Sequence, residues 1–187
     1  MAGVKGNRRI IYTKKVIRDS LIDLLQDKDI HQITVTDICK KADINRGTFY
    51  THYKDAFDLL ESIEDELFNQ IIEFIGETPA EEYINSLLPR VLELISENKA
   101  LCKILFCRQK DNRILERILS VASMADFEKI CMNSNEFIKS NMNYFIRYSV
   151  GGCISIIQAW LENDMPESPI ELVNIINNIN KIDTTSK

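Results

Sequence analysis

Apolar residues recur at steps of three and four along most of this chain of 187 residues, which is the spacing of one face of an α-helix. The pattern predicts a first helix from Thr13 to about Gln26, with the Thr13 hydroxyl capping its first turn. It also predicts a long helix from Asp55 until Gly76 and another from about Asn141 to Asn163. Because no stretch shows the alternation of a strand, the sequence predicts an all-α protein.

Two segments have the sequence of a capping box, in which a hydroxyl residue precedes a glutamate by three positions. Thr78-Pro79-Ala80-Glu81 predicts the start of one helix, and Ser168-Pro169-Ile170-Glu171 predicts the start of the last. Pro89 falls within the apolar pattern of the first of these helices. Since proline lacks a backbone donor and clashes with the preceding turn, we expect a kink near Leu88.

Further helices are expected at residues 101–106 and 111–130, which brings the total to about nine. We divide them between a three-helix N-terminal domain of residues 1–54 and a larger helical C-terminal domain of residues 55–187. An apolar share of 45% and a charged share of 27% are those of an ordinary globular protein, so disorder is not expected.

The stretch from Ile33 to Lys54, ITVTDICKKADINRGTFYTHYK, predicts two helices joined by a tight turn. Thr34 is placed to cap the first helix with its hydroxyl, and Asn45 is placed to cap the second. Between them, Asp43 is expected to take the left-handed conformation that ends a helix. The segment is therefore predicted to be a helix-turn-helix.

The second of these helices has two unlike faces. Phe49 and Tyr53 lie four residues apart and are expected to turn inward. The other face carries hydroxyls, an aromatic ring and the bare backbone of Gly47, instead of the long charged residues of a solvated face. Such a surface can closely approach the backbone and base edges of a nucleic acid. Arg46, at the start of this helix, can reach a guanine edge or a phosphate.

This segment resembles the DNA-binding domain of the TetR family of bacterial transcriptional regulators. The matching pattern is an apolar-Thr-Val-x-Asp-Ile start, a short turn and then Asn-Arg-Gly-Thr-Phe-Tyr-x-His-Tyr, and the resemblance is close from about Tyr12 to Ile63. It implies a homodimer whose recognition helices, here Arg46 to His52, enter successive major grooves of a palindromic operator in double-stranded DNA. The implied DNA contacts fall on Thr36, Arg46, Gly47, Thr48, Tyr50, Thr51, His52 and Lys54.

Two positions depart from the family pattern. Asp43 stands where the family commonly has glycine, which costs some backbone strain. Ala56 stands where the family commonly has a lysine that touches a phosphate, and Lys54 is the candidate to replace that contact. These departures leave open an alternative function, a coactivator or ligand-binding protein that contacts another regulator instead of DNA. His52 has two open interpretations, a phosphate donor or a partly buried packing residue.

The charge distribution favours the DNA-binding interpretation. The whole chain has a net charge of -5. Residues 1–54 contain 11 Lys and Arg against 6 Asp, a balance of +5, and the remainder contains 12 against 22 acidic residues, a balance of -10. The cationic excess therefore lies on the segment that holds the predicted reading helix, as the neutralisation of phosphates requires.

The N-terminal residues Met1 to Ile11 are predicted to be a flexible arm that carries Lys5, Arg8 and Arg9. Arms of other DNA-binding domains follow a phosphate backbone or reach a minor groove. A disordered, solvated tail is the alternative interpretation.

The last two long helices are apolar on more of their circumference than one internal contact requires. Small residues recur at steps of three and four in the first of them, at Ser149, Gly152, Ser155 and Ala159. The resemblance implies a homodimer formed through these two C-terminal helices. A self-contained bundle core is the alternative.

A cavity in the C-terminal domain would suit an apolar or aromatic ligand. The resemblance implies that an unknown small-molecule effector binds there and changes the angle of the helix that starts at Asp55, which releases a repressor from its operator. Plain core packing is the alternative for each candidate. The candidate ligand-binding residues are Phe106, Met124, Phe127, Phe145 and Tyr148.

Other chemistry finds no support in the sequence. The chain has no glycine-rich phosphate loop, nucleophile elbow or HExxH motif, and its two histidines are His31 and His52, so we expect neither an enzyme nor a cofactor. The five cysteines lack metal-ligand spacing and are expected to be reduced and buried, with a redox role for Cys102 or Cys107 as the alternative. No apolar run fits a signal peptide or a membrane span, so a cytoplasmic protein is expected.

Overall fold

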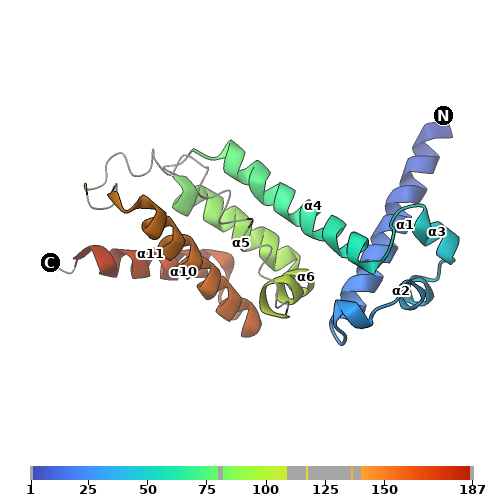
Figure 1. Cartoon of the computed structure of the whole chain (residues 1–187). Helices are drawn as coiled ribbons and strands as arrows, with labels where there is room; N and C mark the ends of the chain where they lie inside the picture. Colours follow the sequence, from blue (N-terminus) through green and yellow to red (C-terminus); the bar gives the residue numbers. More distant parts are fainter. Residues whose placement is uncertain (1, 80–81, 109–116, 118–135, 137–139, 186–187) are drawn as a thin grey trace. The chain divides into compact units, whose positions relative to one another are not determined.

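The computed structural model describes residues 2–79, 82–108, 117, 136 and 140–185 (Figure 1). Within these residues the chain forms eight α-helices, three short 3₁₀ or π segments and no strand, so the all-α prediction is confirmed. The chain divides into two compact units, Met1–Leu67 and Phe68–Lys187. No helix in the described residues is long and apolar enough to cross a membrane.

The first unit contains a helix-turn-helix packed against two longer helices. Its elements are α1 (Ala2–Leu25), η1 (Ile30–Gln32), α2 (Val35–Ala42), α3 (Arg46–Tyr50) and the first turns of α4 (Ala56–Glu77). Ile17 and Leu21 of α1, Ile38 of α2, Phe49 of α3 and Leu59 of α4 are all fully buried. One apolar cluster therefore joins four helices, which fixes α2 and α3 on a rigid support.

The predicted flexible arm at the N-terminus is wrong, because α1 already begins at Ala2. Thr13 lies within this helix and does not cap it. Its Oγ1 donates a hydrogen bond of 2.8 Å to the carbonyl oxygen of Arg9, the partner four residues back that a threonine finds inside a helix. The segment before Thr13 contains no proline, so nothing in it forces the helix to start later.

The long helix α4 (Ala56–Glu77) agrees closely with the predicted one. Asp55 caps it, because Asp55 Oδ1 accepts the backbone N–H groups of Phe57 at 2.8 Å and of Asp58 at 2.9 Å. The buried stripe of α4 contains Leu60, Ile63, Leu67 and Ile71. The boundary between the two units, after Leu67, falls inside this helix, whereas the functional division predicted after Lys54 precedes it and stays a prediction.

The second unit is built from the end of α4, two short α-helices and two long ones. After α4 come η3 (Tyr83–Leu87), α5 (Leu88–Glu97), α6 (Lys99–Lys103), η4 (Ile104–Arg108), α10 (Met142–Glu162) and α11 (Pro169–Thr185). The helix predicted at residues 111–130 lies outside the described residues apart from Arg117. Ala80 and Glu81 of the first predicted capping box also lie outside them.

The irregularity expected near Leu88 is present. A π-helical turn ends at Leu87, an α-helix begins at Leu88, and Pro89 lies in the first turn of that helix. Proline is tolerated there because the backbone N–H that it lacks would have no intrahelical partner. Arg90 follows it, and its guanidinium lies 4.1 Å from the centre of the Phe74 ring and donates a hydrogen bond of 2.8 Å to Glu77, which ties α5 to the end of α4.

The connection between α10 and α11 is held by specific contacts. The capping box predicted at Ser168 is confirmed, since Glu171 Oε2 accepts the Ser168 N–H at 2.8 Å and the Ser168 hydroxyl at 2.7 Å. Asp164 has a positive φ of 63°. Asp164 Oδ1 lies 3.0 Å from Lys103 Nζ and 3.4 Å from Lys99 Nζ, and these two lysines lower the pKa of its carboxyl.

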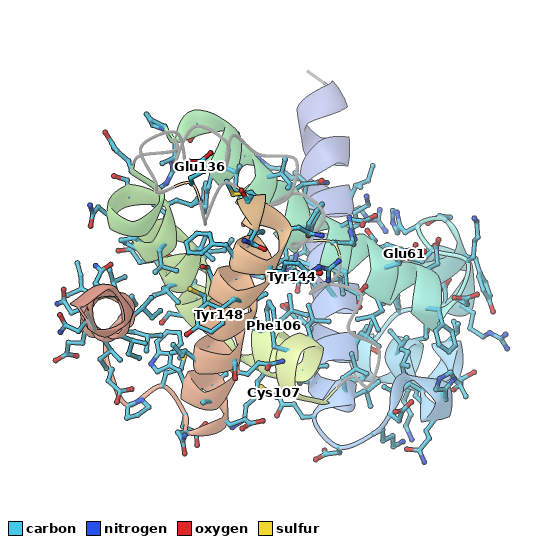
Figure 2. All side chains as sticks on the ribbon, turned by 60° about the vertical axis from the view of Figure 1, so that its left-hand side comes forward. Glu61, Phe106, Cys107, Glu136, Tyr144 and Tyr148 are labelled. Carbon is cyan, nitrogen blue, oxygen red and sulfur yellow. The ribbon has the colours of Figure 1, made fainter. Side chains whose placement is uncertain are left out.

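The two C-terminal helices each keep an exposed apolar face. On α11, Leu172, Val173 and Ile176 are buried while Ile175 and Ile179 are 39% and 44% exposed, in line with the expectation that its apolar residues cover more than one internal contact. On α10, exposed aromatic and small residues follow one another at steps of three and four, with the exposed Arg147 and Glu162 near the two ends of this face, and Figure 2 shows its two tyrosines. This face contains Tyr144, Tyr148, Gly152, Ser155 and Ala159.

Candidate nucleic-acid interface

The first helix of the pair, α2, is opened by a reciprocal capping box. Thr34 Oγ1 accepts the Asp37 N–H at 3.2 Å, and Asp37 Oδ2 accepts the Thr34 N–H at 3.0 Å and the Thr34 hydroxyl at 2.7 Å. These hydrogen bonds from Thr34 lower the pKa of the Asp37 carboxyl. The sequence predicted the cap but missed Asp37 as the second half of the box, although the three-residue spacing indicates it.

The turn between the two helices is formed by Asp43. It takes the predicted left-handed conformation, with φ 51° and ψ 47°, and its N–H donates to the carbonyl oxygen of Cys39. The next N–H, that of Ile44, donates to the same oxygen at 3.1 Å. These two hydrogen bonds provide donors for a carbonyl oxygen at the end of α2. The left-handed backbone costs an L-residue on the order of 1 kcal/mol.

Asn45 caps the reading helix α3. Its Oδ1 accepts both the backbone N–H of Thr48 at 2.7 Å and the Thr48 hydroxyl at 3.1 Å. A Cβ added to Gly47 would lie 3.2 Å from this same oxygen, which is tighter than ordinary van der Waals contact. The glycine therefore leaves the capping oxygen undisturbed and presents bare, exposed backbone.

The inward face of the reading helix is as predicted. Phe49 is fully buried and Tyr53 is 8% exposed, with their ring centres 5.8 Å apart. Burial raises the pKa of the Tyr53 hydroxyl. The helix is shorter than the predicted Arg46 to His52, because it ends at Tyr50 and continues as a turn in which the N–H groups of His52 and Tyr53 both donate to Phe49 O.

On the outward face, Arg46 and Tyr50 form a pair. Arg46 Nη2 donates a hydrogen bond of 3.0 Å to the Tyr50 hydroxyl oxygen, and the guanidinium carbon lies 5.7 Å from the centre of the tyrosine ring. This hydrogen bond raises the pKa of Arg46 further. Tyr50 is 49% exposed, so the pair is presented to solvent. Its four-residue spacing is a signal from which the pairing can be predicted.

The two threonine hydroxyls on this face donate within the protein. Thr48 donates to Asn45 Oδ1, and Thr51 Oγ1 donates 2.6 Å to the carbonyl oxygen of Thr48. Each hydroxyl has a single proton to donate, so in this conformation neither donates to a phosphate oxygen. The phosphate contacts implied for Thr48 and Thr51 therefore require their hydroxyls to rotate, and they stay predictions.

The remaining predicted contacts lie at the edges of the helix pair. Thr36 and Lys54 are exposed and His52 is partly exposed. The Lys54 backbone N–H donates to Asp58 Oδ2 at 2.9 Å, which holds this residue at the start of α4. Ala56 is only 3% exposed, so its methyl group belongs to the core. Lys54 remains the candidate to make the phosphate contact that the family places at residue 56.

Two further cations on α2 were not among the DNA contacts predicted from the sequence. Lys40 and Lys41 lie in the last turn of α2, and both are exposed. Lys41 Nζ lies 3.1 Å from Asp23 Oδ2 of α1, so Lys41 is occupied by an ion pair, and Lys40 adds a positive charge close to the turn. Their position four and five residues before Asn45 was the available signal.

The candidate ligand-binding residues differ in how far they are buried. Phe106 is buried at 8% exposure, and its carbonyl oxygen accepts a hydrogen bond of 2.8 Å from Gln158 Nε2 of α10. Phe145 is partly exposed, whereas Tyr148 is 66% exposed. Figure 2 shows Phe106 and Tyr148. Met124 and Phe127 lie outside the described residues.

Two known families match the chain. The family described as "Bacterial regulatory proteins, tetR family" matches residues 17–63, and the family described as "Transcriptional regulator C-terminal region" matches residues 82–181. The first match contains the helix-turn-helix and the start of α4. The second covers more than half of the chain and most of its second unit.

Curated relatives divide into short and long matches. The chain is 35% identical over 51 residues to the transcriptional regulator YxbF of Bacillus subtilis and 37% identical over 65 residues to the dhaKLM operon transcriptional activator DhaS of Lactococcus lactis. These matches span only 13% and 35% of the two relatives. The chain is also 26% identical over 176 residues to a fatty acid metabolism regulator protein of Bacillus subtilis, covering 86% of this chain and 89% of that protein.

Solved structures share the fold. A TetR transcriptional regulator from Streptococcus agalactiae matches with a TM-score of 0.66 and 24% identity over 96% of this chain and 98% of that one. FadR from Bacillus subtilis in complex with stearoyl-CoA matches with a TM-score of 0.63 and 21% identity over 87% and 94%. At these identities the likeness shows the fold alone.

Replacing the capping residue should weaken the reading helix. Asn45→Ala removes the acceptor for two hydrogen bonds from Thr48, so we expect the free energy of unfolding to fall by about 1 kcal/mol in urea titrations. Asn45→Asp keeps an acceptor in place and serves as the matched control. Equal stability of the alanine and aspartate variants would contradict the capping role.

Proposed function

Because the chain belongs to the TetR family of DNA-binding transcriptional regulators, we propose that it represses transcription by binding a palindromic operator as a homodimer, and that a small-molecule effector releases it. The family is non-enzymatic, in agreement with the expectation from the sequence. The observation that carries the proposal is the exposed pair of Arg46 and Tyr50 on the outward face of α3.

This pair can contact DNA because the hydrogen bond between its two side chains leaves other donor groups available for DNA. Tyr50 accepts from Arg46, so the tyrosine proton is available to a phosphate oxygen or a base acceptor. The guanidinium retains further N–H groups for the O6 and N7 atoms of a guanine or for a phosphate. The contact with the ring limits the rotamers of Arg46, which reduces the entropy lost on binding.

We assign the reading role to residues 1–54 and the effector-binding and dimerisation roles to residues 55–187. The helix α4 begins directly after the reader and ends in the second unit, with Arg90 holding its last turns. A shift of α5 on effector binding would act on α4 through this residue. In a two-fold dimer, such a movement changes the spacing of the two reading helices and so the affinity for a palindrome.

The dimer is proposed to form through α10 and α11. The exposed residues Tyr144, Gly152 and Ala159 of α10 and Ile175 and Ile179 of α11 carry no charge and give each copy a largely apolar helical surface. A Cβ added to Gly152 would meet nothing within 4 Å in the single chain, so a second helix has room to approach closely. Two such surfaces related by a two-fold axis form a four-helix interface.

For the effector, the long-chain acyl class is the first to test. A relative matching over 86% of this chain is a fatty acid metabolism regulator, and FadR was solved with stearoyl-CoA. Phe106 is buried and Phe145 is partly exposed, and both offer apolar rings that suit contact with such a ligand. We therefore propose an effector with an apolar portion that binds in the second unit.

Activation is the second candidate function, because the relative DhaS is an operon activator and this chain lacks the family lysine at Ala56. A coactivator that contacts another regulator would not need an operator of its own. A reporter driven by the protein's own upstream region separates the two modes. Deletion of the gene that encodes this protein raises the reporter signal if the protein is a repressor and lowers it if the protein is an activator.

Binding to a duplex from the protein's own upstream region tests the reading surface. We expect Arg46→Ala to weaken binding by about tenfold to a hundredfold, the amount of one good base contact, in fluorescence anisotropy titrations. Tyr50→Phe keeps the ring but removes the hydroxyl, so it should give a smaller loss. Both side chains are exposed, so the melting temperature should not change. Parental affinity in both variants would overturn the assigned surface.

The same titration tests the effector class. Stearoyl-CoA added to the complex should raise the dissociation constant for the duplex by about fivefold or more, which is the usual range of allosteric coupling. Stearate, which has the same acyl chain without the CoA group, is added at the same concentration to separate recognition of the chain from recognition of the headgroup. An unchanged affinity with stearoyl-CoA would exclude this class of effector while leaving the DNA-binding proposal intact.

Sedimentation tests the proposed dimer. Ala159→Glu places a charge on the exposed face of α10, and in a two-fold interface the two copies of this charge come close together. We expect the parent to sediment as a dimer and this variant as a monomer. Asn174→Glu adds the same charge to α11, five residues before Ile179 and on another side of the helix, and should leave the dimer intact. A dimeric Ala159→Glu variant would exclude this interface.

A further inference from the structure

The first eighteen residues carry only positive charge. Asp19 is the first acidic residue of the chain, and the first turn of α1 contains no acidic side chain. A helix start is normally stabilised by acidic residues there, because the helix dipole places partial positive charge at this end. The basic residues before Asp19 are Lys5, Arg8, Arg9, Lys14, Lys15 and Arg18.

These charges lie on a helix that extends beyond the folded core of its unit. No side chain from Arg8 to Lys15 is buried, and the fully buried residues of α1 begin at Ile17. Figures 1 and 2 both show the N-terminal part of α1 extending past the helices α2 and α3. Among the described side chains of this extension, from Arg8 to Lys15, none is buried against the rest of the unit, so they are open to an outside partner.

Two of the exposed cations and an exposed tyrosine lie on the side of α1 opposite the core, whereas the exposed Lys14 lies on the core side of the helix. Arg8, Tyr12 and Lys15 follow one another at steps of four and three residues, so they share one face of α1. Ile17 and Leu21, which are fully buried, lie on the other face. Arg18, by contrast, pairs with Glu66 of α4. Arg9, next to Arg8 in the chain and also exposed, borders this face. The result is a solvent-facing stripe on α1 formed by Arg8, Arg9, Tyr12 and Lys15.

We propose that the stripe formed by Arg8, Arg9, Tyr12 and Lys15 binds the phosphate backbone of duplex DNA beside the base pairs that α3 reads. The proposal deepens the proposed function, since it adds a second DNA surface to the same unit. Phosphates are the complementary partner of a stripe that carries three cations and no acidic residue, and Tyr12, which is 68% exposed, adds a hydroxyl donor.

The helical form of the extension decides how it binds. An α-helix is about 10–12 Å across with its side chains, whereas the minor groove is about 6 Å wide. The extension therefore lies along the phosphates and cannot enter the minor groove as an extended arm does. From Arg8 to Lys15 it spans about 10 Å, which is about the distance covered by three phosphates along one DNA strand. Its contribution is independent of base sequence.

Salt-dependent binding to two duplexes tests this surface. The probes are a labelled duplex of about 30 base pairs from the protein's own upstream region and a scrambled duplex of the same composition. The variant Arg8→Gln/Arg9→Gln/Lys15→Gln keeps good helix formers but removes three charges per protomer. We expect it to bind both duplexes more weakly by the same factor, with the slope of log K against log salt reduced by about 0.9 for each phosphate that is no longer neutralised.

The charge-retaining variant Arg8→Lys/Arg9→Lys is the matched control and should keep the parental slope. An unchanged slope in the glutamine variant would overturn the proposal. If the slope is unchanged and the glutamine variant also melts at a lower temperature than the parent at low salt, the stripe pairs with acidic residues of the protein instead of with DNA. If the parent bound both duplexes equally, sequence-specific reading of this region would fail, but the slope on the scrambled duplex would still test the stripe.

Discussion

The proposed DNA-reading surface depends on the burial of Phe49. Helix α3 has five residues, far fewer than the roughly 12–15 that an isolated helix needs to be stable in water. Its orientation is therefore imposed from outside, by Phe49 at 0% and Tyr53 at 8% exposure and by the cap at Asn45. Because these inward contacts fix the backbone, they also fix the directions in which Arg46 and Tyr50 point, so the core of the first unit determines what the outward face can reach.

Features that arise within a few residues could be predicted from the sequence. The caps at Thr34, Asn45 and Ser168 each close a hydrogen bond over three positions, so residue type and spacing suffice. Thr13 shows the limit of the same rule. A threonine that caps a helix and one that lies within it are the same in sequence, and the difference here is that its hydroxyl finds Arg9 O four residues back, because α1 continues through it.

Features that depend on distant packing could not be predicted. The sequence shows that the last helix is rich in apolar residues, but which of them face the core is decided by the neighbouring helices, so Ile176 is buried while Ile179 is exposed. Asp164 contacts Lys99 and Lys103, which lie 65 and 61 residues away, and no local pattern indicates this cluster. The residues of the reading face were predictable by contrast, because the short spacing of a helix-turn-helix places them without reference to the second unit.

The hydrogen-bond pattern on α3 and the charge distribution of the chain support one another. Thr48 and Thr51 donate their protons within the protein, so cations must supply most of the first contacts with phosphates. The balance of +5 over residues 1–54 and of -10 over the remainder places those cations at one end of the chain. Because phosphates repel the acidic remainder and attract the basic segment, encounters with DNA favour the end that carries α3. In the proposed function, the base contacts are then made by a protein that is already oriented, and the threonine hydroxyls rotate toward DNA afterwards.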